Sequence, residues 1–145
     1  HAVRSAFREK FAQSKPDMLF IGMARGVDIW VAELAVDMRI PFTACIPCGG
    51  QLWRWGRSWT DRYMKLHSKA AKVVRTSTDY HCEPRHYKRR NAFMVDQAEK
   101  VIALWDSTPG GTAHCVKYAQ ATNTPVVNVY GRFREFFQKF HNASP

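Results

Sequence analysis

Three short segments of the sequence combine residue types that bind phosphate groups. Residues 22–28 follow an apolar run at 18–21. Residues 109–112 follow a second apolar run at 101–105, and residues 90–94 lie in a helix-like pattern that leads into that run. Open α/β sheets bind their ligands at the carboxyl ends of parallel strands, where each strand is followed by a helix. We therefore expect the three segments to meet in one cleft.

Residues 22–28, Gly-Met-Ala-Arg-Gly-Val-Asp, predict a phosphate-binding turn. The two glycines permit a tight backbone, and the following helix offers unpaired N–H groups with a partial positive charge. Arg25 adds a cation, and Asp28 is placed to cap the helix or to bind a ribose hydroxyl. A plain strand-to-helix turn with a capping aspartate fits the same residues. The spacing lacks the full dinucleotide fingerprint, so it does not indicate a classical NAD site.

Residues 109–112, Pro-Gly-Gly-Thr, offer similar chemistry. Gly110 and Gly111 let a phosphate approach the backbone, and the Thr112 hydroxyl can cap the helix or bind that phosphate. Asp106, at the end of its predicted strand, is placed to orient a sugar or the loop. No lysine follows the glycines in P-loop position, which argues against ATP hydrolysis of that type. The alternative is a glycine-rich turn with Thr112 as its N-cap.

Arg90 and Asn91 complete the predicted site. A guanidinium matches phosphate with two hydrogen bonds, and an amide both donates and accepts. The alternative is a basic exposed helix face, which fits Lys88 and Arg89 better than Arg90. The three segments together predict these ligand-binding residues: Gly22, Met23, Ala24, Arg25, Gly26, Asp28, Arg90, Asn91, Asp106, Gly110, Gly111 and Thr112.

We predict no catalytic residue, no metal and no cofactor. Cys45, Cys48, Cys82 and His86 formally make four zinc ligands. However, Cys45 falls inside a predicted strand and no second close pair exists, so the pattern does not favour zinc. Cys115 directly follows His114 on a predicted helix, where adjacent side chains diverge, so it does not indicate a nucleophile.

The net charge of +10 is concentrated in one part of the chain. Residues 51–90 hold eleven Lys and Arg against three acidic residues. Such a field attracts phosphate-bearing partners, either nucleotides or nucleic acid, although a solvated basic surface is the plain alternative. Trp53, Trp55 and Trp59 alternate with arginines in this window, which suits base stacking on a mononucleotide or a single strand. A loop that covers an apolar surface, or an oligomer contact, fits these tryptophans equally well.

Length and composition indicate one soluble domain over residues 1–145. The chain is 46% hydrophobic and 23% charged, and no apolar run approaches the roughly 20 residues that span a bilayer. The four cysteines are too few and too irregularly spaced for a disulfide framework, so we expect a reducing cytoplasm. The exposed aromatic residues are compatible with a homo-oligomer.

Apolar periodicity predicts strands that alternate with helices. This alternation is typical of a three-layer α/β, Rossmann-like domain with a mostly parallel sheet. The predicted strands are 18–21, 42–46, 73–76, 101–105 and 126–130, and the predicted helices are 3–13, 27–38, 61–72, 84–99, 112–122 and 131–141.

These segments, in this order, resemble the SLOG superfamily of YpsA, DprA and LOG phosphoribohydrolases, and most of all its YpsA-like branch. The residues that carry the resemblance are 22–28 with Ala32 and Glu33, then 46–48, 90–94 and 106–112. The resemblance implies binding of a nucleotide-derived small molecule, such as a mononucleotide, ADP-ribose or a cyclic nucleotide signal, for sensing or sequestration. It also leaves two alternatives open: LOG-like hydrolysis of a nucleotide N-glycosidic bond, and DprA-like binding of single-stranded nucleic acid.

Two departures from the family pattern bear on these alternatives. LOG hydrolases carry a glutamate three residues after the Gly-Thr pair, and here Cys115 stands at that position. Hydrolysis would therefore need Arg90 together with a carboxylate from elsewhere, Asp106 or Asp28. The second departure is the family's opening strand, with its glycine and arginine, which we do not find in the sequence.

Overall fold

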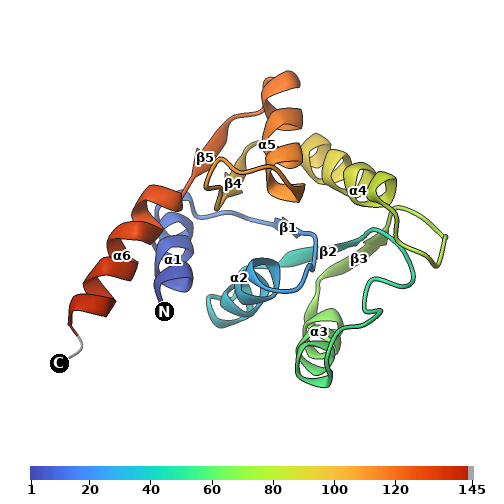
Figure 1. The fold of residues 1–145 in the computed structure, drawn as a ribbon, viewed down its shortest axis with the longest axis horizontal. Coiled ribbons are helices and arrows are strands. Elements are labelled where there is room, and N and C mark those ends of the chain that lie inside the picture. The colour runs from blue at the N-terminus through green and yellow to red at the C-terminus, as the bar shows by residue number, and fades with distance from the viewer. Residues whose placement is uncertain (144–145) are drawn as a thin grey trace.

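The computed structural model describes residues 1–143 (Figure 1). Helices and strands alternate along the chain, as the periodicity predicts. In chain order they are α1 (Ala2–Ser14), β1 (Leu19–Ile21), α2 (Val27–Asp37), β2 (Phe42–Ile46), α3 (Arg57–Lys69), β3 (Lys72–Arg75), α4 (Pro84–Gln97), β4 (Val101–Ala103), α5 (Gly111–Ala121), β5 (Val126–Asn128) and α6 (Tyr130–Asn142).

All strand pairs are parallel, but the strands form two sheets rather than one. β1, β2 and β3 lie in that order, with Leu19 beside Phe42 and Thr43 beside Lys72. β4 and β5 form a separate pair, with Val101 beside Val126. The α/β, Rossmann-like class is confirmed, and the division of the sheet is a feature that periodicity did not predict.

Several elements begin or end at residues other than those predicted. β4 ends at Ala103, two residues early, because the Trp105 amide donates to the Asn128 side chain instead of to a strand. α3 begins at Arg57, four residues early, since Gly56 serves as its N-cap. Each difference arises from a contact or backbone conformation at the element end rather than from the apolar pattern.

Helices cover both sheets and enclose two apolar clusters. The first lies between α2, α3 and the β1–β2–β3 sheet, around Ile29, Phe42 and Leu66. The second joins α1 and α6 to Leu34 of α2 and to Val129. In α1 the residues at helical spacing on one face are buried: Val3, Ala6, Phe7 and Phe11.

α6 carries Phe133, Phe136, Phe137 and Phe140 at helical spacing, and only part of this apolar face packs on the second cluster. Phe133 and Phe136 contact the cluster, while Phe137 is 51% exposed. None of the helices within residues 1–143 is both long and apolar enough to cross a membrane.

Candidate ligand-binding cleft

One cleft of about 880 Å³ brings parts of the three predicted segments together. It lies between the two sheets and is lined by residues from α1, β1, α2, α4, β4 and α5. Eight of the predicted residues line it: Gly22, Ala24, Arg25, Asp28, Arg90, Asn91, Gly111 and Thr112. Segments far apart in the sequence therefore meet where β1 and β4 end, as expected for an open α/β fold.

Arg90 lies deep in the wall of this cleft and is only 5% exposed. Its Nη1 donates to the carbonyl oxygen of Gly22 at 2.5 Å and, at 3.4 Å, to that of Cys45. Its Nε donates to Oδ1 of Asn91 at 3.0 Å. The guanidinium thus joins α4 to the carboxyl ends of β1 and β2, in addition to offering positive charge to the cleft.

Gln51, which the sequence did not single out, belongs to the same cluster. Its Nε2 donates to the Gly22 carbonyl at 3.0 Å, so that one oxygen accepts from both Gln51 and Arg90. Its Oε1 is buried and has no hydrogen-bond partner within residues 1–143. No spacing signal marks Gln51, because its contact with Gly22 is made only in the folded chain.

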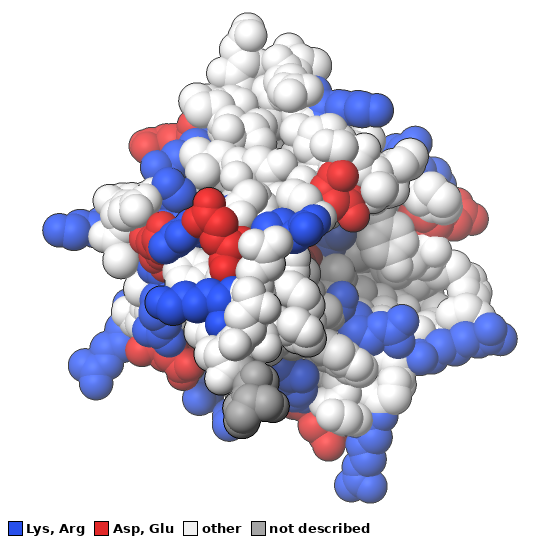
Figure 2. Space-filling view, turned by 60° about the vertical axis from the view of Figure 1, so that its left-hand side comes forward, with Lys and Arg blue, Asp and Glu red and all other residues white. Residues whose placement is uncertain are grey.

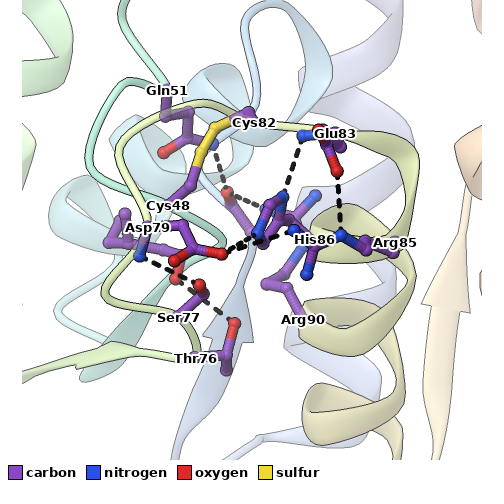
Figure 3. The surroundings of a disulfide bond; sticks show 12 residues. Cys48, Gln51, Thr76, Ser77, Asp79, Cys82, Glu83, Arg85, His86 and Arg90 are labelled. Carbon is purple, nitrogen blue, oxygen red and sulfur yellow. Dashed lines mark hydrogen bonds and ion pairs between the residues drawn. A yellow bond between two sulfur atoms is a disulfide. The ribbon is translucent and has the colours of Figure 1, made fainter.

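The start of α4 is held in place by a network that includes a disulfide (Figure 3). Cys48 and Cys82 are bonded, with their Cα atoms 5.5 Å apart. The Glu83 amide donates to Nδ1 of His86 at 2.9 Å, which forms half of a capping box. Nε2 of His86 lies 2.9 Å from Oδ2 of Asp79, and this bond lowers the pKa of Asp79.

This disulfide corrects the sequence-based expectation for cysteine. The number and spacing of the four cysteines predicted no disulfide framework, yet Cys48 and Cys82 are paired across 34 residues. The reason is tertiary, since the loop after β2 and the loop before α4 lie side by side. The amides of Gly49 and Gly50 donate to the carbonyls of Asp79 and Tyr80, at 2.9 and 2.8 Å. Cys45 and Cys115 are free.

The loop between β1 and α2 is shaped by Met23 and Asp28. Met23 is fully buried with φ of 58°, so its side chain packs in the core instead of lining the cleft. Gly26, with φ of 101°, is the N-cap of α2 and makes no side-chain cap bond. Oδ2 of Asp28 accepts from the Ala24 amide at 3.0 Å. Burial raises the pKa of Asp28, and the Arg90 charge and the Ala24 amide oppose that rise.

The N-terminus of α5 opens into the cleft. Its N-cap is Gly110, with φ of 148° and no side-chain cap bond, so Thr112 does not cap the helix, which was one of the two roles considered for it. Gly111 and Thr112 occupy the first turn and are exposed. Nδ2 of Asn91 donates to the Gly111 carbonyl at 3.2 Å and so connects α4 to this turn. The first-turn N–H groups, which lack intrahelical partners, are therefore available to an anion.

Asp106 and Gly110 line a different hollow, of about 310 Å³, beside Tyr130 and Phe133. Oδ1 of Asp106 accepts from the hydroxyl and amide of Thr108, and these two bonds lower the pKa of Asp106. Gly111 and Thr112 line both spaces. Of the two carboxylates proposed for the site, only Asp28 lies in the cleft with Arg90.

Comparison with known proteins identifies the family. The profile of the YpsA family, described as the YspA SLOG family, matches residues 1–130. This chain belongs to that family.

Curated relatives are distant and mostly longer than the matched region. A UPF0398 protein of Bacillus thuringiensis (strain Al Hakam) is 19% identical over 139 residues, which cover 90% of this chain and 76% of that protein. A UPF0398 protein of Staphylococcus haemolyticus is 22% identical over 60% of this chain and 49% of its own length. The SPbeta prophage-derived protein YoqJ of Bacillus subtilis is 36% identical over 27% of this chain and 23% of its own length. The chain thus spans less than half the length of the last two.

In this SLOG protein Cys115 lines the cleft. Burial raises its thiol pKa, and the negative charge of Asp28 adds to that effect. A neutral thiol therefore stands at the position where the LOG hydrolases carry a carboxylate. Among residues 1–143, no group of three or more His, Cys, Asp or Glu side chains is arranged to hold a metal ion.

The basic window of this SLOG protein is partly neutralised. Arg62 bonds to Glu33, Arg85 bonds to Glu83, and Arg90 is buried. Figure 2, which views another side of the molecule, shows Lys and Arg interspersed with Asp and Glu over much of that face.

The tryptophans of the same window differ in accessibility. Trp55 packs edge-on against Tyr63, and Trp59 packs against Trp30. Trp53 is 65% exposed and carries the Arg54 guanidinium over its ring at 4.3 Å. Only one of the three is therefore available as an open stacking surface.

Proposed function

We propose that the cleft binds a nucleotide-derived small molecule through its phosphate, and that the protein senses or sequesters this ligand. The observation that carries the proposal is the convergence of two helix N-termini without side-chain caps, those of α2 and α5, with the guanidinium groups of Arg25 and Arg90. Helix N-termini and arginines both favour an anion. Membership of the SLOG family supports a nucleotide-related ligand.

The residues have distinct roles in this proposal. The backbone N–H groups of Gly111 and Thr112 bind the phosphate, and Arg25, which is exposed, folds over it. Arg90 contributes positive charge from the wall of the cleft. Its hydrogen bonds to other residues within 1–143 use Nε and Nη1, which leaves Nη2 for the ligand. Asp28 is placed to accept from a ribose hydroxyl.

The proposal is tested by native mass spectrometry of freshly purified protein, followed by titration calorimetry with AMP and ADP-ribose. Arg25→Ala should weaken binding of the better ligand by at least about tenfold, because it removes one charge-assisted hydrogen bond worth about 1.5–3 kcal/mol. Arg89→Ala is the matched control, since Arg89 is exposed on α4 but does not line the cleft. Equal affinities for the two variants, or no affinity for either ligand, would contradict the proposal.

Hydrolysis of a nucleotide N-glycosidic bond is the second candidate, and Asp28 is the observation in its favour. It is a carboxyl group with a raised pKa that lies in the cleft with Arg90. A general acid of an enzyme that acts near neutral pH needs such a raised pKa. Incubation with AMP should then release free adenine, and Asp28→Asn should abolish the release. If no adenine appears, binding alone remains.

Salt dependence separates pocket binding from binding of a single strand. An oligonucleotide held by many phosphate contacts should lose orders of magnitude in affinity between ~50 and ~200 mM salt, whereas a pocket ligand should lose far less. Trp53→Ala provides the matching variant, because Trp53 is the exposed tryptophan of the basic window. If the protein binds an oligonucleotide tightly, and both added salt and Trp53→Ala weaken that binding, binding of single-stranded nucleic acid is favoured.

A further inference from the structure

The smaller hollow, between the loop after β4 and the start of α6, has aromatic walls. Trp105, Tyr130 and Phe133 all line it, and each of these side chains is partly buried. Its volume of about 310 Å³ is at the lower end of the range for small-molecule pockets. The hollow therefore suits one planar ring system rather than a whole nucleotide.

Asn128, at the end of β5, holds two of these aromatic residues in place. Its Oδ1 accepts from the amides of Trp105 and Tyr130, both at 3.1 Å, and its Nδ2 donates to the Trp105 carbonyl at 2.8 Å. The Trp105 ring is held as well, because its Nε1 donates to the Thr108 carbonyl at 2.9 Å. A ring that is already fixed loses little side-chain freedom when a planar ligand stacks on it.

The polar side of the hollow offers hydrogen-bond acceptors. Oδ1 of Asp106 accepts from the Thr108 amide and hydroxyl, at 3.0 and 2.5 Å, and Oδ2 accepts from no other residue within 1–143. The carboxylate is exposed and ionised at neutral pH, since the Thr108 bonds lower its pKa. An ionised carboxylate only accepts. The Trp105 indole N–H and the Thr108 hydroxyl already donate within the fold.

Among the nucleic-acid bases, guanine has the edge that matches such acceptors. Its N1–H and its N2 amino group are neighbouring donors, so both can bond to one carboxylate. Adenine and cytosine each place a ring acceptor beside their amino group, and that acceptor would face the negative charge. Uracil has a single N–H between two carbonyls. Guanine is also a purine, with a large face for stacking on an aromatic ring.

The hollow is continuous with the predicted phosphate position. Gly111 and Thr112 line both the hollow and the cleft. A Cβ atom at Gly110 or Gly111 would meet nothing within 4 Å, so the backbone of this turn is open to a ligand. A nucleotide whose base occupies the hollow therefore has its phosphates over the first turn of α5, on the way to Arg25 and Arg90.

We propose that the hollow is a base subsite for guanine, in which Trp105 stacks on the base and Asp106 accepts from N1–H and the N2 amino group. This inference rests on the proposed function, because the phosphates of the same ligand bind at the start of α5. The guanosine ribose then lies between the hollow and that turn. A ribose hydroxyl bonded to Asp28 belongs to a second sugar, carried beyond the phosphates.

The test is titration calorimetry of the full chain with GDP, inosine diphosphate and ADP at one salt concentration. GDP should bind at least about tenfold more tightly than ADP, because two hydrogen bonds to a charged group are lost with adenine. Inosine diphosphate should fall between them, since it keeps N1–H but lacks the amino group. Asp106→Asn should remove or reverse the preference for GDP. Asp61→Asn is the matched control, because Asp61 is exposed on α3 and lines neither space.

Stacking is tested separately at Trp105. Trp105→Ala should weaken GDP binding by about five- to a hundredfold, the usual effect of removing an aromatic ring under a base. Trp105→Phe keeps an aromatic face and should lose less. Trp53→Ala, at an exposed tryptophan that lines neither space, should leave GDP binding unchanged. Equal losses in Trp105→Ala and Trp105→Phe would trace the effect to the indole bond with Thr108 and would contradict stacking.

The outcomes distinguish the base subsite from the proposed function. Equal affinities of the wild type for GDP and ADP would overturn the guanine subsite. Nucleotide binding that depends on Arg25 but not on Asp106 or Trp105 would place the base elsewhere, and the phosphate site would stand without this inference. No affinity for any of the three nucleotides would overturn both. If Trp105→Ala fails to fold, Asp106→Asn decides, and an unchanged ratio of GDP to ADP affinity would overturn the subsite.

Discussion

The Arg90 guanidinium lies directly against the backbone of Gly22, 68 residues away in the sequence. Nη1 donates to the Gly22 carbonyl, and a Cβ atom at position 22 would lie 2.8 Å from Cζ of Arg90. Gly22 is therefore required because the Arg90 side chain packs directly against it. Backbone conformation is not the reason, since the φ of Gly22 is not in the left-handed region. Gly22, which the sequence suggests for a phosphate-binding turn, thus has a second function: it leaves room for the buried Arg90 guanidinium beside that turn.

Gly22→Ala should destabilise the protein by roughly 1–3 kcal/mol, the usual cost of overpacking a filled site. The added methyl group pushes the guanidinium off the Gly22 carbonyl and shifts the charge that faces the cleft. Urea unfolding measures the change. Gly131→Ala is the control, since nothing lies within 4 Å of a Cβ at that helical position. It should be neutral or stabilising by up to about 1 kcal/mol. Equal effects of the two substitutions would show that Gly22 is not needed to make room for the Arg90 guanidinium.

Arg90→Lys should lower the free energy of unfolding by about 1–3 kcal/mol, although lysine keeps the positive charge. The ammonium cannot reproduce the forked contacts with Gly22, Cys45 and Asn91, so buried acceptors lose partners. Arg89→Lys, at the neighbouring exposed position, should change the free energy of unfolding by less than about 0.5 kcal/mol. If Arg90→Lys unfolds at the same urea concentration as Arg89→Lys, the buried bonds contribute nothing to stability.

Reduction of the Cys48–Cys82 disulfide should lower the free energy of unfolding by about 2–4 kcal/mol. The disulfide restricts the unfolded chain and holds the loop before α4, the helix that carries Arg90. Thermal unfolding with and without dithiothreitol measures the effect. Cys82→Ser should unfold at the lower temperature in both conditions and lose its response to the reductant. A wild-type protein indifferent to the reductant would show that the disulfide does not stabilise the fold.

Asp28 should make stability fall as pH rises above the acidic range. Burial raises the pKa of Asp28 above its ordinary value of 3.8, so the folded chain holds the proton more tightly than the unfolded chain. The resulting stabilisation is fully present below about pH 3.8 and is lost as pH rises through the folded-state pKa. Asp28→Asn keeps an acceptor for the Ala24 amide but cannot ionise.

Urea unfolding of wild type and Asp28→Asn over a pH series measures this loss. The variant should gain in stability relative to wild type as pH rises through that window. Asp79 acts in the opposite direction, because its bond with His86 lowers its pKa; its contribution is lost as pH falls. Comparison at each pH with Asp28→Asn, which retains Asp79, removes that effect. If the stabilities of wild type and Asp28→Asn change with pH in the same way, Asp28 has the same pKa in the folded and unfolded chains.

Part of the candidate site was predictable because its signals are local. Glycines beside Arg25 and Thr112, each after an apolar run, mark strand ends wherever the strands later pair. Six of the eight predicted residues that line the cleft lie in these two segments. Asp106 could not be assigned in the same way: it sits at a predicted strand end, yet the Thr108 bonds keep it in a separate hollow.

The sequence by itself determined the alternation of helices and strands and the position of the predicted phosphate-binding turns, because periodicity and turn chemistry act over a few neighbouring residues. Only the tertiary structure decided that Gln51 and Arg90 share the Gly22 carbonyl, that Cys48 pairs with Cys82, and that β1 and β4 belong to separate sheets. These relationships join residues 29, 68 and 34 positions apart, or strands from different sheets, and they depend on distances in space that no local pattern encodes.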